Sequence, residues 1–148
     1  MTDPTDSPHR IVNPDGLLPP VGFAHAVVAA SGRTVHLGGQ TGHLGDGTIA
    51  PGLVDQFDQA LANLEVALAA CGGAGTDLVS IHVYTTDIDA YREASRDLGE
   101  AWRRHLGRHY PAMAVFGVDA LYDPRAVVEV VATAVVPESR PRSGPASA

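Results

Sequence analysis

The order of apolar patterns along this chain of 148 residues predicts one α+β domain. Short runs with the two-residue alternation of a strand are interrupted by only two segments that show the period of a helix. The last strand-like run, AVVEVVATAVV, is apolar on both faces, unlike a strand with one wet face. The predicted order is β-β-α-β-α-β-β, with the two helices on one face of the sheet.

The first part of the chain predicts an arm followed by two paired strands. Residues 1–20 are polar and broken by prolines, so we expect an extended N-terminal arm ahead of a single domain spanning residues 21–136. AHAVVAA (24–30) and TVHLGG (34–39) are strand-like runs joined by SGR. A short turn with glycine between such runs is typical of a β-hairpin.

The apolar spacing predicts two helices. The first extends from Leu53 to Ala70, because its leucines and Phe57 recur three or four residues apart, and CGGAG ends it. The second begins after Asp87, a residue type that commonly caps a helix N-terminus. Its apolar residues share one stripe: Ile88, Tyr91, Leu98, Trp102 and Leu106.

Three further strands complete the predicted sheet. LVSIHVYTT (78–86) alternates apolar and polar residues between the two helices. PAMAVFGV (111–118) and AVVEVVATAVV (126–136) follow the second helix and are separated by the turn-like ALYDPR. The tail, residues 137–148, is of low complexity, and we expect it to be disordered.

The doubly apolar last strand also predicts an assembly. An α+β layer usually places its helices on one side of the sheet, so two helices leave the other side uncovered. Further copies of the chain would cover that side. We therefore expect a homo-oligomer with clefts between its subunits.

Composition argues against several function classes. The net charge is −7 and every basic residue is an arginine, so the lysine of a phosphate-binding loop or of a Schiff base is absent. The acidic balance argues against general binding to nucleic acid or to anionic membranes. The N-terminus is unlike a signal peptide, and no apolar run is long enough to span a bilayer. With a single cysteine, Cys71, an internal disulfide is excluded, and we expect a cytoplasmic protein.

Glu129 is the most informative ionisable residue. It is the one charged residue in AVVEVVATAVV, and burial of a lone carboxylate is costly unless that group is paired or hydrogen-bonded. Such a residue either transfers protons or forms a structural pair with an arginine or with backbone amides.

The other reactive residue types carry weaker signals. The histidines, among them His36, His43 and His82, lack the spacing of a metal motif, so we expect no metal site. WRRHLGRH (102–109) lies at the end of a helix, where basic side chains face solvent and favour the helix dipole. Cys71 follows an apolar helical turn, and we expect it to be buried and inert.

Six segments form a specific combination in chain order: VGFAHAV (21–27), LGGQTG (37–42), the spaced pattern Q…AL.NL…AL.ACG (56–72), VYTTD (83–87), YPAM (110–113) and VVEVVATAVV (127–136). Together they resemble the YjgF/Rid family of reactive-intermediate imine deaminases, often called endoribonuclease L-PSP. The likeness extends over about residues 10–136. It implies the chorismate-mutase-like fold, a homotrimer, and a ligand cleft at each subunit interface.

The resemblance implies roles for particular residues. Glu129 corresponds to the strand glutamate that positions or activates the hydrolytic water. Gly39 and Gln40 match the family's S-G-Q turn near the cleft, with Gly38 in the place of the usual serine. The glycine-rich loop is therefore expected at the mouth of the cleft and not around a nucleotide.

Two of the implied cleft residues depart from the family pattern. Phe23 stands where the known deaminases have a tyrosine, and Met113 replaces the P-A-R arginine that clamps the substrate carboxylate. A thioether cannot replace a bidentate cation, so either the substrate is not an α-imino acid or another arginine enters the cleft. Arg96 and Arg125 are the candidates, and Val115 is expected to contact the substrate near Met113.

The leading expectation is thus a divergent Rid-type hydrolase or deaminase that acts on a small enamine, imine or related metabolite without a cofactor. The alternative is a non-catalytic trimer that binds small metabolites, because an apolar cleft without the clamp still forms a pocket. Ribonuclease or translation-inhibitor activity is suggested by the family's label and by WRRHLGRH, but the acidic charge disfavours it.

Overall fold

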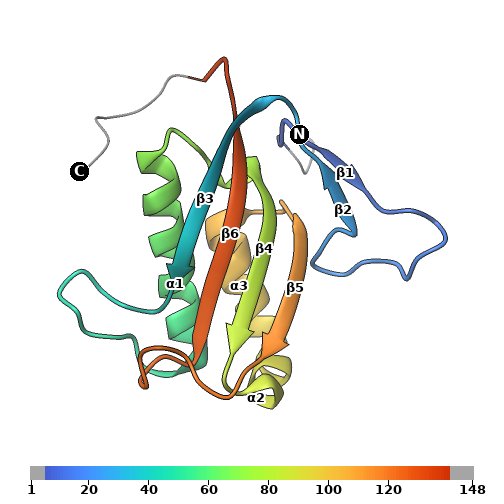
Figure 1. The fold of residues 1–148 in the computed structure, drawn as a ribbon. Helices are drawn as coiled ribbons and strands as arrows, with labels where there is room; N and C mark the ends of the chain where they lie inside the picture. Colours follow the sequence, from blue (N-terminus) through green and yellow to red (C-terminus); the bar gives the residue numbers. More distant parts are fainter. Residues whose placement is uncertain (1–5, 141–148) are drawn as a thin grey trace.

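The computed structural model describes residues 6–140, and four strands form its main sheet. They lie in the order β3-β6-β4-β5 (Figure 1), with the bounds β3 (Gly32–Gln40), β4 (Leu78–Thr85), β5 (Ala112–Gly117) and β6 (Val128–Pro137). The central strand β6 is antiparallel to both β3 and β4, whereas β4 and β5 are parallel. This mixed α+β architecture confirms the predicted fold class.

The helices cover one face of the sheet, as predicted. α1 (Gly52–Ala70) packs on β3 and β6, and α3 (Ser95–Leu106) lies beside α1. The second predicted helix is divided at Ala94 into α2 (Ile88–Glu93) and α3, and a short 3-10 turn, η1 (Gly75–Asp77), leads into β4. Asp87 does cap α2, because its side chain accepts a hydrogen bond from the Ala90 N–H at 2.9 Å.

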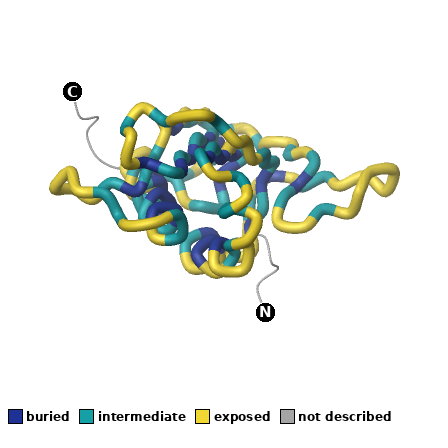
Figure 2. The backbone as a smooth tube through the Cα atoms, turned by 90° about the horizontal axis from the view of Figure 1, so that it is seen from below, coloured by how far each residue is buried: buried dark blue, intermediate teal, exposed yellow. Residues whose placement is uncertain are grey.

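The core lies between this helical layer and the sheet. Leu61 and Leu64 of α1 are fully buried against Val83 of β4 and Val130 of β6, and Trp102 of α3 closes the layer. Figure 2 shows the buried backbone concentrated there, with projecting loops on either side that are exposed. No helix within residues 6–140 is long and apolar enough to cross a membrane.

The predicted pairing at the N-terminus is wrong. Arg10–Val12 of the expected arm forms β1, and β2 (Ala26–Val28) pairs with β1, with Ile11 opposite Val27. β3 pairs instead with β6, which offers a much longer partner. A hairpin signal shows where the chain can turn but not which strand offers the better partner. The predicted disordered tail lies outside the described residues from position 141 onward.

The second face of the sheet carries no helix in the described part of the chain. Val128, Val130 and Ala132 of β6 point into the core, so by alternation Glu129 and Val131 point away from it. Neighbouring strands add His36, His82, Tyr84 and Phe116 to this outer face. Coverage of the outer face by further copies stays a prediction.

Candidate functional site

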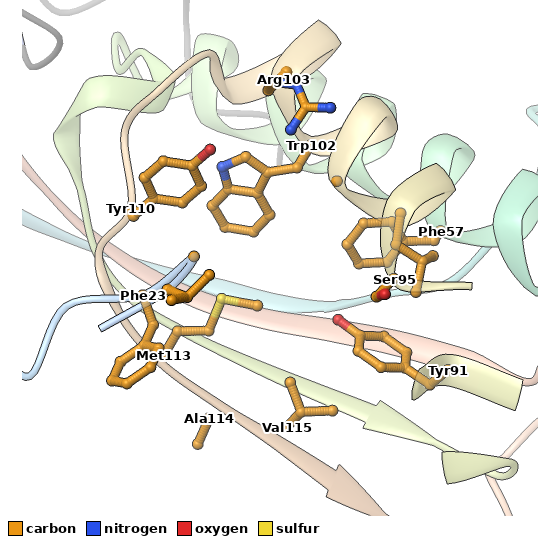
Figure 3. A pocket seen from close by; sticks show the side chains of 14 residues that line it. Phe23, Phe57, Tyr91, Ser95, Trp102, Arg103, Tyr110, Met113, Ala114 and Val115 are labelled. Atoms are coloured by element: carbon orange, nitrogen blue, oxygen red, sulfur yellow. The ribbon is translucent and has the colours of Figure 1, made fainter. Parts of the chain in front are cut away.

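A pocket of about 520 Å³ lies on the helical side of the sheet, beside the edge strand β5 (Figure 3). Its walls come from residues 21–23, from α1 through Phe57, from α2 and α3, from Tyr110 and from residues 113–115. A concave, mostly apolar pocket with a few polar groups is the usual form of a small-molecule site.

Edge pairing at the start of β5 brings the N-terminal segment to this pocket. The Ala24 N–H donates to the Pro111 carbonyl at 3.0 Å, and Ala24 forms a parallel bridge with Ala112. Phe23 is thereby held at the pocket wall, near Met113. Met113 lies on β5 opposite the buried Ile81, which places its side chain on the helical face.

One stripe of α3 forms the opposite wall. Ser95, Leu98, Gly99, Trp102 and Arg103 recur at helical spacing and all line the pocket. The stripe therefore includes Gly99 between the predicted apolar positions Leu98 and Trp102, and it ends at Arg103.

Aromatic rings define the shape of the cavity. Trp102 and Tyr110 are stacked, with ring centroids 5.9 Å apart and planes 10° apart. Phe57 and Tyr91 meet edge to face at 6.2 Å. Burial raises the pKa of the Tyr91 hydroxyl to about 12, so this phenol is neutral and can donate a hydrogen bond.

The polar groups of the lining can bind a ligand but cannot serve as an ordinary acid–base pair. Among residues 6–140, the lining contains the hydroxyls of Tyr91, Ser95 and Tyr110 and the guanidinium of Arg103, but no carboxylate and no imidazole. The Trp102 indole N–H already donates to the His109 carbonyl at 3.1 Å. A base for hydrolysis must therefore come from elsewhere.

Glu129 lies on the outer face, away from this pocket. It stands opposite Tyr84 across the β4–β6 pair, and its carboxylate packs directly on Gly39 of β3. A Cβ added to Gly39 would come within 2.8 Å of the Glu129 Cδ and closer still to Oε1. Gly38 has open space at the same point. Of the two neighbouring glycines, Gly39 is therefore the one that the carboxylate requires.

The residues predicted from the sequence thus separate within one chain into those that line the pocket, those at the β3–β6 pair, and the two candidate arginines. Phe23, Met113 and Val115 line the pocket. Glu129 and Gly39 meet at the β3–β6 pair on the outer face. Gln40 lies opposite the core-facing Val130, and its side-chain amide donates to the Gly38 carbonyl at 3.2 Å.

Neither candidate arginine lines the pocket. The Arg96 guanidinium is 3.6 Å from Glu100, and its side chain is 89% exposed. Arg125 forms hydrogen bonds with Asp123, the shortest of 2.7 Å. The cation at the pocket is Arg103, which belongs to the WRRHLGRH segment. The basic side chains of that segment were expected to face solvent. Arg103 lies four residues after Gly99 and eight residues after Ser95, so it shares their face of the helix. This spacing is the signal that could have identified it.

The loop after β3 contains a further polar cluster. His43 lies between the Thr41 hydroxyl and Asp123, with 2.9 Å between its Nε2 and Asp123 Oδ2. Hydrogen bonds from Arg125, and then from His43, hold the pKa of Asp123 well below its usual range. Asn63 of α1 donates to the carbonyls of Thr41 and His43, so this cluster ties two loops to the helix.

One prediction about the remaining reactive residues is wrong. Within residues 6–140, no group of three or more histidine, cysteine or acidic side chains is placed to hold a metal ion. Cys71, expected to be buried, is exposed and is not part of a disulfide. It is the C-cap residue of α1, where the chain has already left the apolar stripe of the helix.

Comparisons with known proteins identify relatives over most of the chain. The family model described as endoribonuclease L-PSP matches residues 16–136. A crystal structure of a Rid-family protein of unknown function from Yersinia pestis is 33% identical, covers 86% of this chain and 98% of its own, and gives a TM-score of 0.78. RidA from a Psychrobacter species is 27% identical, with 86% and 99% covered and a TM-score of 0.63.

A more distant structure agrees with these two. A protein from Thermotoga maritima described as a putative endoribonuclease is 26% identical, covers 84% of this chain and 91% of its own, and gives a TM-score of 0.62. No curated protein matches the chain.

Proposed function

The chain belongs to the endoribonuclease L-PSP family, also called the YjgF/Rid family, and we propose that it hydrolyses small imines or enamines as a homotrimer. The substrate would occupy the pocket beside β5, and the Glu129 carboxylate of a neighbouring copy would reach it across the subunit interface. A molecule bound there meets an apolar wall from this chain and an acid–base group from the next.

The chemistry requires only water and one carboxylate. Glu129 accepts a proton from the water that adds to the C=N carbon and passes it to the nitrogen, which gives a carbinolamine. A second transfer, from the new hydroxyl to the nitrogen, releases ammonia as the carbonyl product forms. An enamine enters the same sequence after it gains a proton at carbon and loses one from nitrogen, which gives the imine.

The observation that carries this proposal is the separation of two incomplete halves. The pocket has walls but no base, and Glu129 is a positioned carboxylate without a pocket, on the opposite face of the same sheet. The pocket opens beside the edge strand β5, where Val115 and Phe116 are 36% and 44% exposed. Exposed apolar side chains beside an unpaired strand edge favour docking of another copy.

Turnover of imines in solution tests this function. The protein is incubated with 2-iminopropionate and with several uncharged imines generated in situ, and release of the carbonyl product is followed. We expect acceleration with at least one of these imines and its loss in Glu129→Gln, by at least about a hundredfold because general acid–base catalysis contributes that much. Glu93→Gln, an exposed carboxylate on α2, is the matched control.

Two results would contradict the proposal. One is the absence of acceleration with every imine, and the other is full activity in Glu129→Gln. Size-exclusion chromatography with light scattering tests the assembly, since a monomer at micromolar concentration contradicts the shared site.

A non-catalytic role as a metabolite-binding trimer is the second candidate. It is favoured by the same absence of a carboxylate or imidazole from the pocket lining. Ligands that raise the melting temperature and are recovered unchanged would support it. Cleavage of RNA is disfavoured by the net charge of −7, and salt-insensitive absence of RNA binding would exclude it.

A further inference from the structure

The pocket contains a cation, although Met113 replaces the arginine that clamps the substrate carboxylate in the family pattern. Arg103, on the α3 wall, lines the cavity across from Met113 of β5 (Figure 3). Its guanidinium folds back along the helix, so that NH1 lies 3.4 Å from where a Gly99 Cβ would be. Glycine inside a helix is unfavourable relative to alanine. Here the missing side chain leaves the space beside the guanidinium open.

Arg103 differs from the other arginines of this helical region. Arg92, Arg96 and Arg104 each have a carboxylate partner, respectively Asp89, Glu100 and Asp58. Among the hydrogen bonds and ion pairs of residues 6–140, none involves the Arg103 side chain, although its backbone carbonyl accepts a hydrogen bond from the Gly107 N–H. Its donors are therefore free to bind an anion at the pocket.

The walls next to Arg103 suit a flat or bulky apolar group. The stacked pair Trp102 and Tyr110 lies on one side of the cavity, and Phe57 and Phe23 contribute further rings. Aromatic faces bind other rings by offset stacking or edge-to-face contact. A molecule that satisfies both features carries an anionic group next to a ring.

We propose that Arg103 is the anion-binding residue of this pocket and that the ligand is an organic acid with an aromatic or bulky apolar body. The inference rests on the proposed function in one respect, since it takes the pocket to be the substrate site. The preferred substrates are then imines or enamines that carry both a carboxylate and such a body. Arg103 supplies from α3 the charge that Met113 does not supply from β5.

Binding measured without turnover tests this assignment. Trp102 is the one tryptophan of the chain and lines the pocket, so its fluorescence reports occupancy directly. Phenylacetate is titrated into the protein, with phenylacetamide as the neutral molecule of the same shape. We expect phenylacetate to bind the wild type at least about tenfold more tightly than the amide, as a charged hydrogen bond would give.

Charge variants identify the residue responsible. Arg103→Gln is expected to weaken phenylacetate binding about tenfold or more and to leave the amide unchanged. Arg103→Lys keeps the charge but loses the planar fork, so it should fall between the two. Arg108→Gln is the matched control, because it removes an equal charge from an exposed residue that does not line the pocket. Both positions are exposed, and melting temperatures check that the three variants are folded.

The outcomes separate this assignment from the proposed function. Equal affinity for acid and amide, no binding of phenylacetate, or an unchanged affinity in Arg103→Gln overturns it. If uncharged imines are still hydrolysed in that case, the function stands and the ligand class is wrong. If phenylacetate binds through Arg103 while no imine is turned over, the ligand class stands and the hydrolase function is wrong.

Discussion

The two faces of the sheet differ in what they can do. The helical face carries a pocket with aromatic walls, three hydroxyls and one guanidinium. The outer face carries the Glu129 carboxylate, which packs against Gly39. Met113 and Glu129 lie on strands of the same sheet but point to opposite sides of it. Under the proposed function, recognition and proton transfer would therefore lie on opposite faces of one chain, and a second copy of the chain would bring them together.

The two faces also differ in how they are supported. The pocket is backed by the core through Phe57, Leu98 and Trp102, all nearly or fully buried. The outer face depends on cross-strand neighbours, such as the stacked pair Tyr84 and Phe116, 5.5 Å apart. We therefore expect changes on the helical face to affect stability and binding, and changes on the outer face to affect turnover.

The largest effect is expected at Gly39. In Gly39→Ala the new methyl group overlaps the Glu129 carboxylate, so the carboxylate must move. We expect turnover to fall by about a hundredfold or more, stability to fall by about 1–3 kcal/mol, and the binding of phenylacetate in the pocket to persist. Gly38→Ser, at the neighbouring glycine with open space, should leave all three unchanged. Wild-type turnover in Gly39→Ala would show that the position of Glu129 does not matter.

Met113 gives the opposite result on the helical face. Met113→Ala removes a half-buried side chain that packs on the core, which should lower the free energy of unfolding by about 1–2 kcal/mol. Ligand affinity should fall about three- to tenfold, with maximal turnover retained. Met113→Leu conserves the volume and is the control. A loss of maximal turnover with unchanged affinity would place Met113 in the chemistry and not in the pocket wall.

The loop cluster predicts a pH dependence of stability. Hydrogen bonds from Arg125 lower the pKa of Asp123, so the ionised form stabilises the fold above the carboxylate's unfolded pKa, about 4. This contribution is lost as the pH falls from about 4 through the lower pKa of the folded state. Denaturant unfolding from pH 6 to pH 2 should therefore show the stability advantage of wild type over Asp123→Asn shrinking. Asp55→Asn, on the exposed side of α1, should show no such change.

The smallest effect is expected from the pocket phenol. Burial raises the pKa of Tyr91 to about 12, so the stability that neutral Tyr91 contributes is complete below pH 10 and is lost as the pH rises through about 12. Ligand binding should not depend on ionisation of this group between pH 6 and about 9. In a spectrophotometric titration, Tyr91→Phe should remove the late-titrating phenol, whereas Tyr122→Phe, at a fully exposed position, should leave it in place. A late phenol that persists in Tyr91→Phe would contradict this assignment.

Much of the fold was predictable because local patterns are strong where burial is one-sided. The spacing of leucines predicted α1 almost to the residue, alternation predicted β4, and a run that is apolar on both faces predicted β6. The isolation of Glu129 in an apolar strand singled it out as a candidate, and its role stays a prediction. The family resemblance, carried by segments spread over the chain, agrees with the family model over residues 16–136.

The candidate site was less predictable because it is made by contacts between distant segments. Nothing local shows that Ala24 pairs with Ala112 and so brings Phe23 to the pocket. A run of basic residues at a helix end gives no indication that Arg103 alone turns toward a cavity. Cys71 was misplaced for a similar reason, since burial at a helix end depends on what packs there.

The amino-acid order was enough to define the elements, the class of fold and the family, because alternation, helical spacing and capping act between residues close in the chain. Only the tertiary structure determined that β2 pairs with β1, that Glu129 packs against Gly39, and that Arg103, Trp102 and Met113 line one pocket. Those choices depend on which distant surfaces fit together, and that fit is a property of packing and not of any single segment.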